Sequence, residues 1–309
     1  MFIVTLLIST CIVNLSFREI NAEKPEYLFE SGTEGYACFR IPAMVTTPKG
    51  TLLAFAEGRK GCCSDTGDID LVMKRSEDDG RTWTEPQEIT GSVKKDHWTW
   101  YATGPCHGIQ LKKGPHKGRL LVPCDHIEAA TMKYFSHVIF SDDHGASWEL
   151  GGTTPEDQVN ECTVAELADG RLMLNMRNYD RSQECRKVSY SQDGGESWSH
   201  PVSDTTLIEP ICQASLLSVT AVDGGKQFLL FLNPADTHER QRMTLRISEN
   251  GGADWTGSVL LQEGPSAYSD LAQLQAGDIA CLYEAGMDNP DQGLVYREVF
   301  WSQIVVDTK

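Results

Sequence analysis

One octapeptide pattern, Ser-x-Asp-x-Gly-x-x-Trp, occurs four times in this chain and constrains its fold more than any other feature. The copies begin at Ser76, Ser141, Ser191 and Ser248, and the last has Asn250 where the others have Asp. Each follows an alternating or apolar run that is typical of a β-strand. An Asp or Asn side chain can form a hydrogen bond with the backbone two residues further along the chain, and Gly tolerates a positive φ angle. The pattern therefore predicts a hairpin turn, with the Trp starting the next strand.

A second repeat alternates with the first. A turn glycine followed by a strand-like apolar run occurs at Gly50, Gly118, Gly170, Gly225 and Gly277. Repeats of about 50 residues that hold several strands each are typical of a β-propeller, which has about 4–8 blades. Since no long helical pattern competes with them, we predict an all-β fold.

The N-terminus predicts secretion. The first 15 residues are almost entirely apolar, a run too short for a transmembrane helix but suited to a signal peptide. We expect a signal peptide at 1–22, a single propeller domain at 23–309, and a secreted or lysosomal protein with no transmembrane span. The 287 of 309 residues that remain predict a six-bladed β-propeller at about 48 residues per blade.

The charge and the cysteine and histidine patterns exclude several classes of function. A formal net charge of −17 argues against nucleic acid as a partner, and it means that an anionic ligand would need a local arginine cluster. The chain has neither His-Glu-x-x-His nor Cys-x-x-Cys, so we expect no metal and no cofactor. Ten cysteines become nine after removal of the signal peptide, an odd number that leaves at least one thiol unpaired or bridged to another chain.

Polar residues end most of the apolar strands at the same distance from the repeat glycine. Glu57, Asp125, Arg177 and Glu284 each lie seven residues after it. In a propeller these positions are equivalent, so they would form a ring of charged groups at one rim. The alternative is that these strands simply end in solvent, and for Glu57 and Asp125 the sequence leaves both possibilities open.

Several segments together carry a family resemblance. The motif FRIP at Phe39–Pro42 precedes the octapeptides, which are known as Asp boxes. Four further segments come after FRIP in the family's order: NECTVAELADGRLMLNMR, RQRMTLRIS, GPSAYSDL and LYEAG. This arrangement resembles the exo-α-sialidases, or neuraminidases, of the animal and bacterial type, nearest to the secreted or lysosomal ones. The resemblance implies a retaining hydrolase that acts on terminal α-linked sialic acids of glycoproteins, glycolipids or oligosaccharides.

The resemblance also implies how the sialic acid carboxylate is bound. Three converging guanidiniums would clamp it through charge-assisted, partly bidentate bonds. They would belong to Arg40, Arg177 and Arg240. Glu284 would hold the first of these arginines, and Arg59 would contact the substrate. Arg242 and Arg246 lie close to the third position, which we assign to Arg240 from its distance to the following apolar residue.

The catalytic residues implied by the family are Tyr268 as nucleophile, Glu161 as its partner base and Asp65 as acid/base. A neutral phenol avoids the repulsion that a carboxylate nucleophile would meet beside the substrate carboxylate. Its ordinary pKa is about 10, so it needs a base within hydrogen-bond reach. Asp65 lies in a glycine-rich loop that can become partly desolvated, and Asp68 and Asp70 are its rivals.

Three alternatives share most of these residues. Transfer of sialic acid to another sugar, and release of an anhydro sialic acid, would use the same groups with a different acceptor. A propeller that binds sialic acid without catalysis would keep the arginines and lose the nucleophile, its base or the acid, yet Tyr268, Glu161 and Asp65 are all present.

Overall fold

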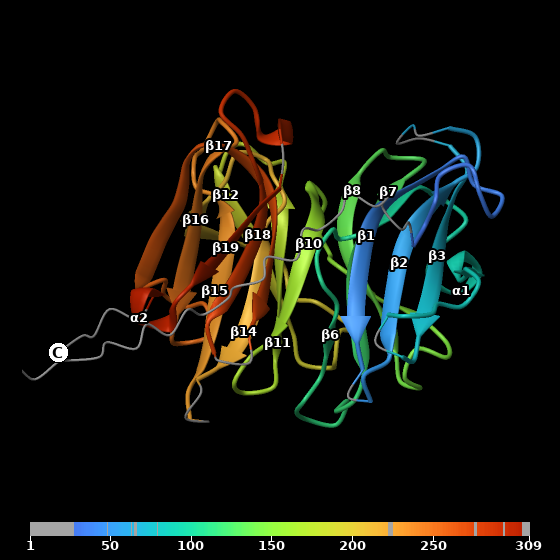
Figure 1. Cartoon of the computed structure of the whole chain (residues 1–309), viewed down its shortest axis with the longest axis horizontal. Coiled ribbons are helices and arrows are strands. Elements are labelled where there is room, and N and C mark those ends of the chain that lie inside the picture. Colours follow the sequence, from blue (N-terminus) through green and yellow to red (C-terminus); the bar gives the residue numbers. More distant parts are fainter. Residues whose placement is uncertain are drawn as a thin grey trace, which may run out of the picture.

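The protein is almost entirely β-structure in this computed structural model, which describes residues 28–47, 49–62, 64, 67–78, 80–221, 225–274, 277–292 and 294–304. Figure 1 shows the strands gathered into upright sheets. The helical elements are the short α1 (Thr90–Val93), η1 (Pro290–Gln292) and α2 (Trp301–Ile304). Within the described ranges, none of them has the length and hydrophobicity needed to cross a membrane. The predicted signal peptide at 1–22 lies outside these ranges.

The first two sheets are made of consecutive antiparallel strands. The first has the order β1-β2-β3-β4, with β1 (Cys38–Thr46), β2 (Leu52–Arg59), β3 (Ile69–Ser76) and β4 (Gln87–Glu88). The second has the order β5-β7-β8-β9, and β6 pairs with β7 beside this path. Its strands are β5 (Trp98–Thr103), β6 (Ile109–Gln110), β7 (Leu120–Glu128), β8 (Tyr134–Ser141) and β9 (Glu149–Thr153).

The remaining strands also follow one another in chain order. The third sheet contains β10 (Val159–Glu166), β11 (Leu172–Asn178), β12 (Cys185–Ser191) and β13 (Val202–Ile208). The fourth contains β14 (Ser215–Thr220), β15 (Gln227–Pro234), β16 (Gln241–Ser248), β17 (Gly257–Gln273), β18 (Ile279–Ala285) and β19 (Leu294–Val299). The long strand β17 pairs with β16 up to Pro265 and with β18 from Ser266 onward, so it divides this sheet into two parts.

The predicted hairpin turns form at all four octapeptides, but the Trp of each copy lies before the next strand and does not start it. At the first copy, the Ser76 hydroxyl donates to Asp78 Oδ1 at 2.9 Å and accepts the Gly80 backbone N–H at 2.8 Å. Asp78 Oδ1 also accepts the Thr82 N–H at 2.8 Å, and Gly80 has φ +81°. The same bonds recur in the other three copies, with Asn250 in the place of Asp in the last. The local chemistry of the repeat therefore dictates the turn.

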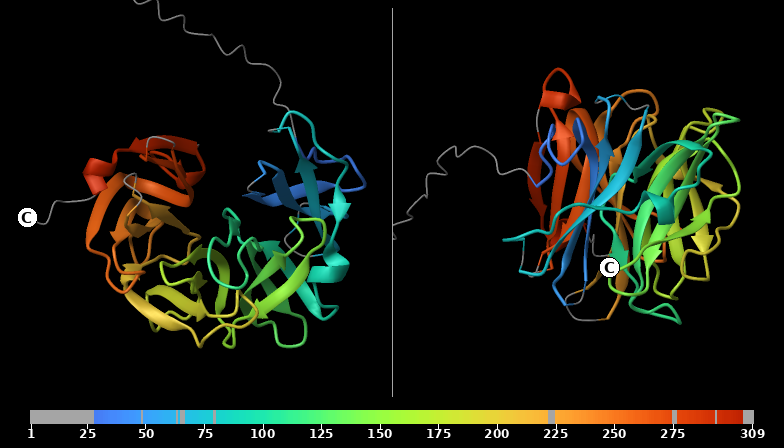
Figure 2. Two further views of the ribbon diagram at one scale, coloured as in Figure 1. Left: turned by 90° about the horizontal axis from the view of Figure 1, so that it is seen from below. Right: turned by 90° about the vertical axis from the view of Figure 1, so that its right-hand side faces the viewer.

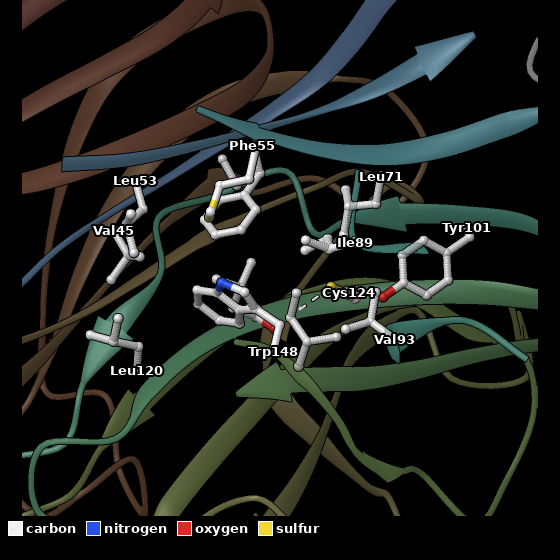
Figure 3. Close-up of a cluster of buried hydrophobic side chains, with 14 of the residues drawn as sticks. Val45, Leu53, Phe55, Leu71, Ile89, Val93, Tyr101, Leu120, Cys124 and Trp148 are labelled. Carbon is white, nitrogen blue, oxygen red and sulfur yellow. Dashed lines mark hydrogen bonds between the residues drawn. The ribbon is translucent and has the colours of Figure 1, made fainter. Parts of the chain in front are cut away.

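The apolar runs after the repeat glycines form strands as predicted: β2, β7, β11 and β15 are largely buried, and β18 alternates between buried and partly exposed residues. Figure 3 shows part of the core, in which the first two sheets bury their facing side chains against each other. The Phe55 and Trp148 rings meet edge to face there, with centroids 5.0 Å apart. Trp148 comes from the second octapeptide, so the turn motif contributes a side chain to the core between the sheets.

The sheets form a propeller-like open arc, with β1–β4 at one end and β17–β19 at the other (Figure 2, left). The prediction of six blades is wrong for the described residues, which form four hydrogen-bonded sheets, the last divided at β17. The prediction allotted about 48 residues to a blade. The first strands of successive sheets begin at Cys38, Trp98, Val159 and Ser215, 56 to 61 residues apart. Connections that carry extra elements such as α1 and β6 use the additional residues.

Candidate active site

Four strands carry a β-bulge at a corresponding point of their pairing. Three of them begin a sheet, and the fourth, β17, begins the second part of the last sheet. The register shifts between Arg40 and Ala43 in β1, Trp98 and Tyr101 in β5, Val159 and Cys162 in β10, and Ser266 and Ser269 in β17. Such a bulge leaves residues out of the ladder and changes the direction of their side chains. Glu161 and Tyr268 lie within the bulges of β10 and β17, and their side chains meet.

Tyr268, Glu161 and Arg177 form one hydrogen-bonded group. The Tyr268 hydroxyl donates to Glu161 Oε1, and Arg177 Nη1 donates to Glu161 Oε2 at 2.6 Å. Arg177 Nη1 also lies 3.4 Å from the Tyr268 hydroxyl oxygen. The side chains of Arg177 and Glu161 are each 12% exposed, so the ion pair is largely withdrawn from water. The predicted nucleophile, its base and one arginine of the clamp are thus brought together.

The surroundings keep the tyrosine neutral and the arginine charged. Burial raises the pKa of Tyr268 well above its ordinary range, the Glu161 carboxylate raises it further, and Arg177 opposes both. Burial alone would lower the pKa of Arg177, but the negative charge of Glu161 outweighs it and the pKa is raised. A neutral phenol that hydrogen-bonds a carboxylate has a proton acceptor already in place.

Of the three neighbouring arginines considered for the third clamp position, Arg240 lies over the ring of the tyrosine. Its guanidinium carbon is 5.8 Å from the centroid of the Tyr268 ring. Arg242 instead forms an exposed ion pair with Glu263, and Arg246 donates a hydrogen bond at 3.0 Å to an asparagine of β15. This placement agrees with the choice of Arg240, whose role in binding stays a prediction.

Arg40 and Glu284 lie at opposite ends of the arc of sheets. Arg40 is an exposed residue of β1, paired in register with Glu57 of β2. Glu284 is in β18, where its Oε2 accepts the backbone N–H of Tyr268 at 3.1 Å. The acid expected to hold Arg40 therefore also fixes the backbone of the expected nucleophile, and its contact with Arg40 stays a prediction.

Glu57 and Asp125 are buried polar residues, and the charges of Glu57, Glu161 and Arg177 all act on Asp125. Glu57 and Asp125 are 0% and 1% exposed, so the alternative that their strands simply end in solvent is wrong. Glu57 Oε2 accepts Arg59 Nε at 2.8 Å and Nη2 at 2.6 Å. Arg59 is itself only 1% exposed, and its guanidinium lies 5.6 Å from the Trp100 ring centroid. Whether Arg59 contacts the substrate stays a prediction.

Asp125 is held by Trp100, which lies in the bulge of β5. The Trp100 Nε1 donates to Asp125 Oδ2 at 2.8 Å. Burial raises the pKa of Asp125 well above its ordinary value, and the negative charge of Glu161 raises it further. The sequence marked Asp125 by its position in the repeat, but nothing in the sequence pointed to its pairing with Trp100.

The predicted acid/base Asp65 lies outside the described residues, while both of its rivals lie within them. The Asp70 carboxylate accepts the Tyr36 hydroxyl at 2.9 Å and pairs with Lys60 Nζ at 2.9 Å. Asp68 is an exposed partner of the same lysine at 3.4 Å. Because Asp70 already holds two partners, its geometry does not favour it as the acid, and the role of Asp65 stays a prediction.

Glu209 is a supporting residue that the sequence analysis missed. It is fully buried and lies 3.5 Å from Arg186, which is also fully buried. Its two carboxylate oxygens accept the backbone N–H groups of Asn178 at 3.2 Å and Cys212 at 2.9 Å. These bonds fix the end of β11 next to Arg177. No repeat position or motif distinguishes Glu209, so no sequence signal could have identified it.

A cavity of about 520 Å³ opens beside this group, between the two ends of the arc. Its walls include Ala43 and Phe55 from the first sheet and Tyr268 and Glu284 from the last. The volume is in the range of small-molecule sites, and the walls combine apolar surface with a few polar groups. Three possible metal ligands also line it, Cys106, His107 and Asp270.

Comparison with known proteins places the chain in a family. Residues 29–281 match the BNR repeat-like domain. A sialidase of Bacteroides fragilis is 36% identical over 223 residues, which cover 70% of this chain and 40% of that protein. The chain thus spans well under two thirds of this relative.

Two solved structures are similar in fold and sequence. The Hadza microbial sialidase Hz136 superposes with a TM-score of 0.72 at 27% identity, over 89% of this chain and 68% of that one. The intramolecular trans-sialidase from Ruminococcus gnavus gives 0.64 at 26% identity, over 77% and 52%. The chain therefore belongs to the BNR repeat-like family, and within it to the exo-α-sialidases that its motifs resemble.

Proposed function

We propose that this chain is a retaining exo-α-sialidase that hydrolyses terminal α-linked sialic acids of glycoproteins, glycolipids or oligosaccharides. The observation that carries the proposal is the contact of Tyr268 with Glu161 and Arg177. Sialidases differ from most retaining glycosidases in using a tyrosine nucleophile, and this group supplies the tyrosine, a base and an anion-binding cation. Relatives named sialidases support the same proposal.

Substrate binding would depend on the arginines. The overall charge of −17 gives no general attraction for an anion, so the sialic acid carboxylate needs local partners. Arg177 and Arg240 both lie against Tyr268, and Arg40 would approach from the first sheet. A carboxylate held there would have its adjacent anomeric carbon near the Tyr268 hydroxyl.

The first half of the reaction forms a covalent adduct. The Tyr268 oxygen attacks the anomeric carbon while Glu161 accepts the phenolic proton. The bond from the anomeric carbon to the departing sugar oxygen breaks, and Asp65 gives that oxygen a proton. The phenol has a raised pKa and is neutral before attack, so proton transfer to Glu161 must accompany bond formation.

The second half releases the product. A water molecule gives a proton to Asp65 and attacks the anomeric carbon from the face that the departing sugar has left. The bond to Tyr268 breaks, and Glu161 returns the proton to the phenolic oxygen. Two inversions at one carbon give net retention, so the first product is the α-anomer of free sialic acid.

Transfer reactions are a second candidate, because one of the similar structures is an intramolecular trans-sialidase. The same adduct would then be attacked by a sugar hydroxyl or by a hydroxyl of the sialic acid itself. Incubation with an α-sialoside of a fluorogenic phenol, followed by proton NMR, separates these outcomes. Hydrolysis predicts free α-sialic acid as the first product, whereas an anhydro or transferred product would replace the hydrolytic assignment.

The Tyr268→Phe variant tests the chemistry itself. It keeps the ring and removes the oxygen that forms the adduct, so we expect kcat to fall by at least about 10³-fold. Tyr101→Phe is the matched control, because Tyr101 is buried in the core of the first two sheets and outside the cavity. Thermal unfolding of both variants checks the fold. Near-normal activity in Tyr268→Phe would overturn the proposed nucleophile.

A further inference from the structure

Cys106, His107 and Asp270 meet on the wall of the cavity, although 164 residues separate the cysteine from the aspartate in sequence. The Cys106 thiol donates to Asp270 Oδ1 at 3.4 Å, and its sulfur lies 3.6 Å from His107 Nδ1. His107 Nδ1 lies 2.7 Å from the same Asp270 oxygen. A sulfur, a nitrogen and an oxygen donor thus form one compact triangle.

The segment 104–108 that carries two of these side chains is fixed at both ends. A Cβ on Gly104 would lie 2.4 Å from the Cys162 carbonyl oxygen, and one on Gly108 would lie 2.8 Å from the Val45 side chain. Between them, the Pro105 carbonyl accepts the side-chain N–H of Gln213 at 2.7 Å. The two donors are therefore held in place by tight packing before any ligand arrives.

The same three residue types can form a proton relay, but this arrangement does not match one. A relay of thiol, imidazole and carboxylate uses both ring nitrogens, one for the thiol and one for the carboxylate. Here Cys106 and Asp270 both face Nδ1 of His107. Nε2 is buried and has no hydrogen-bond partner among the described residues. The three donor atoms lie within 4.8 Å of one another, close enough to bind one cation together.

We propose that Cys106, His107 and Asp270 form a binding site for a thiophilic divalent metal ion, for which Zn²⁺ is the best match. Zinc takes thiolate, imidazole and carboxylate ligands at about 2.0–2.3 Å, which spaces tetrahedral ligand atoms about 3.3–3.7 Å apart. The two distances from the sulfur fit this range. The third, the 2.7 Å between His107 Nδ1 and Asp270 Oδ1, would lengthen by roughly 0.6–1.0 Å when the ion replaces the proton.

Three protein ligands leave one position of a tetrahedral ion open, and here it would face the cavity. Asp270 lies two residues after Tyr268 in β17, and both side chains line the cavity. A bound ion with its open position would therefore share the cavity with the predicted nucleophile. The site itself does not depend on the proposed reaction, and its test does not use activity.

Binding is tested on the full chain after treatment with a chelator and a reductant. We expect one equivalent of Zn²⁺ to remain after gel filtration, and a higher temperature of unfolding in its presence. Co²⁺ is the spectroscopic probe, because a cobalt–thiolate bond gives a sulfur-to-metal charge-transfer band in the near ultraviolet. Absence of both the bound zinc and the band would overturn the proposal.

Variants identify the ligands. Cys106→Ala should abolish the charge-transfer band, and Asp270→Asn should weaken Zn²⁺ binding by about 10-fold or more while keeping the side-chain shape. Cys281→Ala is the matched control for a buried free cysteine, and Cys62→Ala controls for an exposed thiol. Both controls should bind as the unmodified chain does. Binding that persists unchanged in Cys106→Ala and Asp270→Asn, or that is lost in Cys62→Ala, would assign the metal elsewhere.

Discussion

Replacement of Glu161 by glutamine tests how much of the proposed chemistry depends on one carboxylate. The change is nearly isosteric, and the amide oxygen can still accept one hydrogen bond. It removes the negative charge that lies 2.6 Å from Arg177 Nη1 and that accepts the Tyr268 hydroxyl. Two effects follow, one on the reaction and one on stability.

The rate effect comes from the lost base. Burial raises the pKa of Tyr268 well above its ordinary range, so without a proton acceptor the phenol is a poor nucleophile. A positioned general base contributes about 10²–10⁴-fold, so Glu161→Gln should lower kcat by that factor. The KM should change less, because the arginines that would bind the substrate remain.

The stability effect comes from Arg177. Removing one partner of a buried ion pair costs about 3–5 kcal/mol, because the other charge is left in a low-dielectric surrounding. Both side chains keep 12% exposure and one hydrogen bond can persist. We therefore expect the free energy of unfolding to fall by about 2–4 kcal/mol.

Kinetics on a chromogenic α-sialoside and urea denaturation measure the two effects separately. Glu166→Gln is the matched control, since Glu166 is a buried acid of the same strand, and its oxygens accept the backbone N–H groups of Lys112 at 2.8 Å and Lys113 at 2.9 Å. It should lose stability but keep kcat. If Glu161→Gln retains kcat within about threefold, or if both variants lose it equally, Glu161 is not the base.

Two further predictions concern charge around the site. Burial and the charge of Glu161 raise the pKa of Asp125 above its ordinary 3.8. The folded protein therefore has its full stability below about pH 3.8, where Asp125 is protonated in both states, and it loses stability as the pH rises through the folded pKa. The Asp125→Asn variant cannot ionise, so its stability relative to the unmodified chain should increase as the pH rises above about 4; a difference in urea midpoints that stays constant with pH would contradict the pKa shift. Arg240→Ala should lower kcat/KM by about 10- to 100-fold through loss of a bond to the substrate carboxylate, while the exposed Arg242→Ala should stay within about threefold. The reverse result would assign the third arginine of the carboxylate clamp to Arg242.

The local structure of the turns and strands could be predicted from the sequence. Each Ser-x-Asp-x-Gly-x-x-Trp copy holds the hydroxyl, carboxylate or amide, and glycine that its own turn needs, so the turns and the adjoining strands followed from short stretches. The family also followed from motifs, because FRIP and the segments around Glu161, Arg177 and Tyr268 are recognisable one by one. The signal peptide and the role of Asp65 stay predictions.

The number of sheets and the pairings within the site depended on tertiary structure. The number of residues per sheet varies with the length of the connections between strands. Dividing the chain length by a fixed number of residues per blade therefore predicted six blades, whereas the described residues form four hydrogen-bonded sheets. Asp125 and Trp100 meet because β5 bulges beside β7, and nothing in the spacing of the sequence encodes that contact.

The possible metal site shows the same limit most clearly. The sequence contained no metal motif, because such motifs detect ligands that share a turn or a helix face. Cys106 and His107 are adjacent, but Asp270 reaches them from a strand 164 residues away from Cys106. The sequence by itself determined the turns and the strands, because these depend on contacts within a few residues, and its motifs supplied the candidates for the reactive side chains. Only the tertiary structure decided which distant side chains share one cavity, because that depends on how whole sheets pack.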